Sequence, residues 1–142
     1  MHCRILFSLA LLFCSLTARA QMERTVYQIF PADSAKAILL DIAGSYELVP
    51  WAADNVLAET HIQIWNASPE ILDYLIEKGR YALEPVREGD NLTLVSKDKE
   101  RKTLKNRNGV WCDEVVLLKL FIPDFYQWPE GQAVKELMLK EN

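Results

Sequence analysis

The stretch V56-LAETHIQIWNASPEILDYLIEKGR-Y81 decides the fold, because it holds a strand pattern, a helix pattern and the signals that separate them. Residues 56–65 alternate at every second position, which is the period of a strand with one buried face. The inward set is Ala58, Thr60, Ile62 and Ile64, and the outward set is Glu59, His61, Gln63 and Trp65. The stretch therefore predicts a strand whose polar row faces away from the core.

A helix is predicted directly after this strand, near residues 69–78. Ser68 suits the N-cap, Pro69 suits the first helical turn, and Glu70 places negative charge at the positive end of the helix dipole. Apolar side chains then recur at three- and four-residue spacing as far as residue 76, and Gly79 is typical of the position that ends a helix.

The first 20 residues have the three parts of a secretory signal peptide. Arg4 precedes an apolar run, and Ala18 and Ala20 form a small-residue cleavage site. The apolar run covers about 12 residues, whereas a membrane span needs about 20. We expect cleavage after Ala20, no membrane span, and a periplasmic or secreted protein. A lipid anchor at Cys14 is the competing interpretation, but bulky Phe13 precedes that cysteine.

The remaining residues 21–142 suit one domain in length. The formal net charge of the 142-residue chain is −4, and loss of Arg4 and Arg19 makes it two units more negative. A negatively charged surface disfavours nucleic acid as a partner. Only Cys112 remains after the leader, so an internal disulfide is excluded and a bacterial envelope fits better than a disulfide-rich eukaryotic secretion route.

The rest of the chain consists mainly of strand signals. Residues 25–30, 37–42, 46–51, 81–86, 92–96 and 110–122 have strand composition, and turn residues separate them. Residues 37–42 and 115–122 are apolar enough to predict strands that are buried throughout, while Pro50 either confines its strand to an edge or ends it. Residues 97–105 suggest a solvated hairpin arm or loop. Residues 132–140 fit either a short helix, which we favour, or a strand.

These signals predict a mainly β domain of about seven or eight strands with one inserted helix near residues 69–78. The predicted architecture is a sandwich or a short, irregular solenoid-like stack.

Two stretches resemble small exported adhesin-like β-solenoid proteins of bacterial envelopes. They are FPADSAKAILLDIA at residues 30–43 and LKLFIPDFY at residues 118–126. The resemblance covers about a third of the mature chain and implies an extracytoplasmic all-β protein without an assigned activity. The helix at residues 68–78 departs from a plain solenoid, and the resemblance assigns no binding residue.

Catalytic chemistry has weak support in the sequence. His61 and Glu59 share one side of the predicted strand and could act together as an enzyme or metal site. However, the chain has no zinc-ligand spacing, phosphate-binding glycine loop or nucleophile elbow. Cys112 and His61 could form a thiol–imidazole pair, but no sequence motif supports this. An unreactive, partly buried thiol is the simpler interpretation. We assign no catalytic residue, metal or cofactor.

Binding is better supported, because aromatic rings offer a large contact area at low entropic cost. Trp65 shares its predicted face with Glu59 and His61, and Tyr126 and Trp128 lie in an aromatic loop. The alternative for Trp65 is that the following helix folds back over it. Trp51 is as well explained as a plug at one end of the core.

The sequence thus favours a non-enzymatic exported envelope protein, a binding or structural module for a protein or glycan partner. The alternative is a small extracytoplasmic enzyme or metal-using protein centred on Glu59 and His61. A third hypothesis is a homodimer formed by an edge strand, either residues 25–30 or residues 115–122.

Overall fold

The protein is described here by a computed structural model that covers residues 21–127 and 136–140. The predicted leader therefore lies outside the described residues. The described elements, in chain order, are β1 (Gln21–Pro31), β2 (Ala37–Asp41), β3 (Tyr46–Trp51), β4 (Asn55–Trp65), α2 (Pro69–Glu77), β5 (Leu83–Glu88), β6 (Asn91–Ser96), β7 (Leu104–Lys105), β8 (Trp111–Cys112), β9 (Glu114–Pro123) and β10 (Glu136–Met138). The prediction of a mainly β chain with one helix is confirmed.

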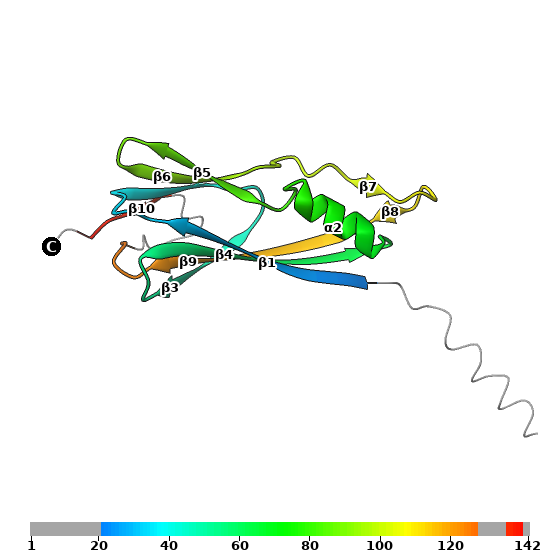
Figure 1. The fold of residues 1–142 in the computed structure, drawn as a ribbon, viewed down its shortest axis with the longest axis horizontal. Coiled ribbons are helices and arrows are strands. Elements are labelled where there is room, and N and C mark those ends of the chain that lie inside the picture. Colours follow the sequence, from blue (N-terminus) through cyan, green and yellow to red (C-terminus); the bar gives the residue numbers. More distant parts are fainter. Residues whose placement is uncertain (1–20, 128–135, 141–142) are drawn as a thin grey trace, which may run out of the picture.

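The strands form two four-stranded sheets of unequal length and a small hairpin. The long sheet has the order β1-β4-β9-β3, the short sheet has the order β10-β2-β6-β5, and β7 pairs with β8. The β3–β9 and β2–β6 pairs are parallel, and the other strand pairs are antiparallel. In Figure 1 the short sheet lies over one end of the long sheet, and α2 with the β7–β8 hairpin lies over the other end.

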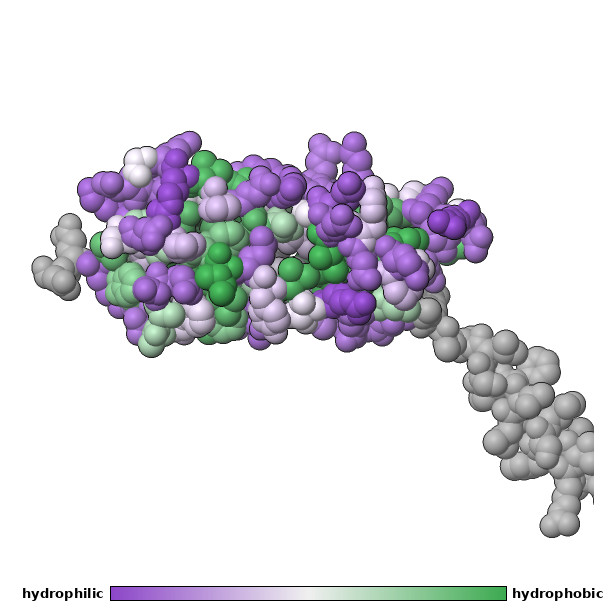
Figure 2. Space-filling view, viewed as in Figure 1, coloured by the Kyte–Doolittle hydropathy of each residue, from purple (hydrophilic) through white to green (hydrophobic). Residues whose placement is uncertain are grey.

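Two hydrophobic cores follow from this arrangement, and β4 contributes to both. Val56 and Ala58 pack in the first core, between the two sheets. Ile62 and Ile64 pack in the second core, with residues of α2 and with Cys112 of β8. All four side chains are buried, so the inward alternation predicted for residues 56–65 is confirmed. Figure 2 shows hydrophobic side chains along the middle of the molecule, between the layers.

Helix α2 begins and ends where its sequence signals predict. Ser68 has extended backbone angles and its side chain accepts a hydrogen bond from the Ile71 N–H at 3.4 Å, which satisfies one free donor of the first turn. At the other end Gly79 has a φ of +77°, its N–H donates to Ile76, and the Arg80 N–H donates to Leu75. This Schellman pattern reverses the chain and directs it toward β5.

Two predictions for single elements were wrong, one for β9 and one for the C-terminal segment. β9 is not buried throughout, because Val115 and Leu117 point to solvent while Leu118 and Leu120 point into the core. β2 lies inside the short sheet, and its Ala37, Ile38 and Leu40 are buried while Leu39 is half-buried. The helix favoured for the C-terminal segment is replaced at Glu136–Met138 by β10, which pairs with β2 and places Leu137 in the first core.

The edges of the sheets also differ in part from the prediction. β1 is an edge of the long sheet, as the edge-pairing hypothesis requires, but β9 lies between β4 and β3 and offers no free edge. β3 is the other edge of the long sheet, as predicted from Pro50. In the described ranges, no helix is long and apolar enough to cross a membrane.

The Gln28 side chain links the edge strands of the two layers. The Gln28 amide of β1 donates from Nε2 to the Leu83 carbonyl at 3.0 Å, and its Oε1 accepts from the Leu83 N–H at 2.9 Å. Leu83 begins β5 and is buried. The side chain therefore pairs with a backbone that would otherwise have no partner at this point.

We expect Gln28→Met to lower the free energy of unfolding by about 1–3 kcal/mol, because it leaves a buried backbone donor and acceptor unpaired at nearly unchanged volume. Urea unfolding measured by circular dichroism checks this. Gln127→Met makes the same change at an exposed position and serves as the control. Equal stability of the two variants would contradict the role assigned to Gln28.

Candidate functional site

The outer face of the long sheet is the candidate site. We define it as the face opposite the two cores, formed by β1, β4, β9 and β3. The short sheet and α2 both pack on the inner face, so neither covers it. Cross-strand pairing arranges its side chains in rows, because residues opposite each other in a sheet point to the same side.

Polar contacts at one end of this face centre on His61. Its Nδ1 lies 3.1 Å from the Thr25 hydroxyl, and its Nε2 lies 3.4 Å from Nε2 of Gln63. Gln63 also donates to Glu23 at 3.1 Å. The imidazole is therefore held between two neutral polar groups on β1 and β4. This arrangement gives a set of donors and acceptors on a flat, half-exposed surface.

The structure brings three of the predicted site residues onto this face and separates Tyr126 from them. Glu59, His61 and Trp65 lie on β4 with side chains that are half-buried. Tyr126 does not join them, because it is fully buried in the first core, where its hydroxyl donates to the Ala35 carbonyl at 2.7 Å. Trp128 lies outside the described residues. The hypothesis that the helix covers Trp65 was wrong, since α2 packs beneath the inward-facing Ile62 and Ile64.

Four exposed apolar residues on the same face were missed by the sequence analysis. Tyr27 and Ile29 of β1 are 61% and 63% exposed, and Val115 and Leu117 of β9 are 42% and 54% exposed. The pairing register places them beside the β4 row, with Tyr27 opposite Glu59 and Leu117 opposite His61. Periodicity gave no signal for the β9 pair, because its run is apolar on both faces.

One end of the face is aromatic. The rings of Trp51 and Phe121 are 5.8 Å apart and tilted by 50°, and Nε1 of Trp51 donates to the Asn55 carbonyl at 2.9 Å. Both side chains are half-buried. Trp51 therefore lies at one end of the outer face and belongs to neither core, so it is not the core plug that was suggested for it.

The geometry gives little support to catalysis at His61. Its recorded contacts are to Thr25 and Gln63, and Glu59 is not among them. Three hollows of the described surface are lined by residues other than these two. Within residues 21–127 and 136–140, no group of three or more histidine, cysteine or acidic side chains is arranged to hold a metal.

Cys112 is separated from His61 by the sheet itself. It is buried in the second core with its Sγ 3.5 Å from the Asn66 carbonyl, whereas His61 lies on the outer face. Burial raises the pKa of its thiol, which disfavours the reactive thiolate. The thiol–imidazole pair is thus ruled out.

A buried ion network lies at the seam between the two cores. The Arg80 guanidinium binds both carboxylate oxygens of Glu114, at 2.7 and 3.2 Å, and donates to the Lys102 carbonyl at 2.8 Å. The Tyr81 hydroxyl donates to the same carboxylate at 2.9 Å. Arg80 is 8% exposed, so its charge depends on these partners.

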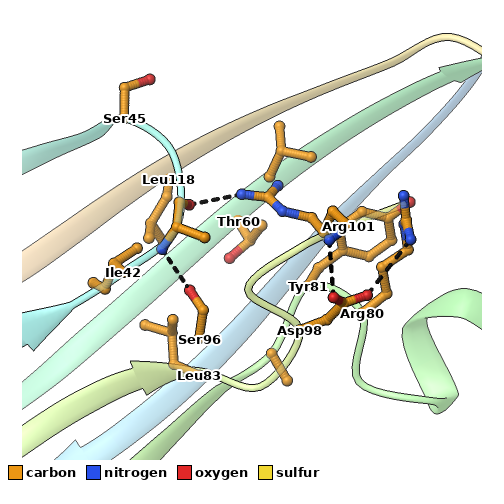
Figure 3. A pocket seen from close by; sticks show the side chains of 13 residues that line it. Ile42, Ser45, Thr60, Arg80, Tyr81, Leu83, Ser96, Asp98, Arg101 and Leu118 are labelled. Atoms are coloured by element: carbon orange, nitrogen blue, oxygen red, sulfur yellow. Dashed lines mark hydrogen bonds and ion pairs between the residues drawn. The ribbon is translucent and has the colours of Figure 1, made fainter. Parts of the chain in front are cut away.

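The loop after β6 is mostly exposed, as predicted, but two of its side chains reach this seam. Asp98 accepts from the backbone of Arg101 at 2.9 Å and lies 3.5 Å from Arg80, and the Arg101 guanidinium donates to the Ala43 carbonyl at 2.7 Å. Ser96 accepts from the Ala43 N–H at 2.9 Å. Figure 3 shows these side chains converging from separate segments.

We interpret the seam as structural. The cavity between its residues has a volume of about 20 Å³, which is far below the few hundred Å³ of a small-molecule site. Thr60 of β4 lines it at the point where the first core gives way to the second. The network therefore fills the junction between the short sheet and α2, the two layers that pack on the inner face of the long sheet.

The seam predicts a specific alkaline pH dependence. Burial first, and then the charge of Glu114, raise the pKa of the Tyr81 hydroxyl well above its ordinary value of about 10. A raised folded-state pKa stabilises the protein fully below pH 10, and this contribution is lost as the pH rises above 10. We expect Tyr81→Phe to lower stability at pH 7 by about 1–3 kcal/mol and to reduce the further loss between pH 9 and 11.

Urea unfolding across this pH range tests the expectation, with Tyr74→Phe on the exposed side of α2 as the matched control. If the free energy of unfolding fell as steeply between pH 9 and 11 in Tyr81→Phe as in Tyr74→Phe, the Tyr81 hydroxyl would not be the group responsible for the pH dependence.

Comparison of the chain with protein-family profiles, with curated proteins and with solved structures found no match. The resemblance to exported β-solenoid proteins therefore stays a prediction, and the candidate site rests on the geometry of the outer face.

Proposed function

We propose that this chain is a non-enzymatic, exported module of a bacterial envelope that binds a protein partner through the outer face of its long sheet. The observation that carries the proposal is the exposure of Tyr27, Ile29, Val115 and Leu117 together on one sheet face. Apolar patches rimmed by polar groups commonly mark interaction sites. The leader, with its cleavage site at Ala20, supports export.

The composition of the face favours a protein over a glycan. Glycan binding relies on exposed aromatic rings that stack on sugars, but Trp51 and Trp65 are half-buried and Tyr27 is the exposed aromatic residue here. Ile29 and Leu117 instead offer aliphatic area, which packs well against another protein surface. We also propose that the two facing sheets form an open β-sandwich that holds this face flat.

Site-specific photo-crosslinking tests the proposal. A photoreactive phenylalanine analogue replaces Leu117 in the chain exported with its own leader, and illumination is followed by mass spectrometry of adducts. We expect a discrete protein adduct from this position. The same analogue at Val86, which is 41% exposed on β5, is the matched control and should give little or none. Absence of a protein adduct at position 117, or equal adducts at both positions, would contradict the proposal.

His61→Ala separates binding from catalysis. A binding surface loses one hydrogen-bonding group, worth about 0.5–1.5 kcal/mol, so the apparent affinity should fall by about tenfold at most. The adduct yield at position 117 as a function of concentration measures this. A hydrolytic activity that is present in the wild type and abolished by His61→Ala would instead favour the enzyme alternative.

A further inference from the structure

The outer face carries a row of polar side chains across its four strands, charged on β4, β9 and β3; we call it the charged row. Cross-strand pairing places Tyr27 beside Glu59, Glu59 beside Lys119, and Lys119 beside Glu47. Nζ of Lys119 lies 3.9 Å from Glu47, and both side chains are well exposed. A single cation thus stands beside two acids at mid-sheet, close to the boundary between β4 and β9.

The next row toward the Trp51 end is apolar on every strand. It consists, in order across the sheet, of Ile29, Leu57, Phe121 and Val49. On the other side of the charged row, His61 of β4 lies beside Leu117 of β9. The face therefore has a fixed lateral order, with acid and imidazole on β4 and cation and aliphatic groups on β9.

This order is self-complementary, and we propose that the partner of the outer face is a second copy of this chain. This inference rests on the proposed function. The two copies pack face to face about a twofold axis that runs parallel to the strands, between β4 and β9. Such an axis keeps each residue at its height along the strand and exchanges β4 with β9 and β1 with β3.

The charged row and the apolar row then each meet a suitable row of the second copy. Glu59 lies opposite Lys119 of the second copy, and the same pair repeats by symmetry. In the apolar row, Leu57 lies opposite Phe121 and Ile29 lies opposite Val49. The Tyr27 hydroxyl lies opposite the Glu47 carboxylate. A twofold axis along the charged row would instead place Lys119 against Lys119 and Glu59 against Glu59, which like-charge repulsion disfavours.

The area of the face suits a stable dimer. β1, β4, β9 and β3 have 11, 11, 10 and 6 residues. With a rise of about 3.3 Å per residue and a spacing of about 4.8 Å between strands, the four-stranded face covers roughly 600 Å². Specific complexes of standard size bury about 600–1,000 Å² on each partner. The dimer therefore needs this face alone and leaves the β1 edge unused.

Charge reversal in separate copies tests the proposal. Sedimentation equilibrium of the wild type at about 100 µM, a concentration at which micromolar complexes are assembled, should show a dimer. Glu59→Lys and Lys119→Glu should each weaken self-association by about 100-fold or more, because each places like charges opposite one another twice. A 1:1 mixture of the two variants should form a heterodimer, detected by native mass spectrometry, because their charges are complementary only across the interface.

Controls keep the result interpretable. Glu77→Lys makes the same charge change on the exposed side of α2 and should leave the dimer intact. Leu117→Asp should also give a monomer, which provides an independent variant if Lys119→Glu folds poorly. Circular dichroism of each variant verifies folding.

Several results would overturn the proposal. One is a wild type that is monomeric at about 100 µM. Another is that the charge variants stay dimeric, which edge pairing through β1 would allow. A third is that the mixture of the two charge variants does not associate. A monomeric wild type whose Leu117 probe crosslinks to a different protein would refute the dimer and retain the proposed function. A monomer without any adduct at that position would refute both.

Discussion

The structure depends on the burial of one face of β4. Val56, Ala58, Ile62 and Ile64 are buried beneath two different covers, and a buried aliphatic side chain contributes about 1.5–3 kcal/mol. The short sheet covers the first pair and α2 covers the second pair. Because a strand alternates strictly, this burial also fixes which residues reach the outer face.

The junction of the two covers explains where the polar residues of the interior lie. Neither the short sheet nor α2 reaches across the whole long sheet, so chain segments from several elements meet near Thr60. The Arg80–Glu114 pair satisfies its charges there with two direct hydrogen bonds and with the Tyr81 hydroxyl. Losing one member of such a pair costs about 3–5 kcal/mol, so the seam specifies how the layers are joined.

Local patterns in the sequence predicted the local parts of the fold. The alternation of residues 56–65, the Ser68 and Gly79 ends of the helix and the β5–β6 hairpin depend on neighbouring residues, and the structure has all of them. The parallel β2–β6 and β3–β9 pairs join segments far apart in the chain, which no local pattern encodes. β10 forms for the same reason, since its pairing with β2 overrides a weak helical pattern.

The candidate site was predicted only on its polar side. Glu59, His61 and Trp65 alternate with clearly apolar neighbours, so their side of the sheet could be deduced. Val115 and Leu117 sit in a run that is apolar on both faces, which is equally typical of a fully buried strand. Their exposure follows from the absence of a layer over the outer face, in the described part of the chain. Tyr126 shows the opposite error, because its ring is buried in the first core and its hydroxyl is satisfied there by the hydrogen bond to Ala35.

Hydroxyl-radical footprinting of the native chain tests the two-faced long sheet most directly, because it compares neighbouring residues of the same type. Leu117 is 54% exposed and Leu118 is 8% exposed, and they are adjacent on β9. In dilute protein we expect strong oxidation of Leu117 and of His61, with protection of Leu118, Ile62 and Ile64. Equal oxidation of Leu117 and Leu118, or modification of Ile62 as fast as His61, would contradict the alternation on which the fold and its outer face depend.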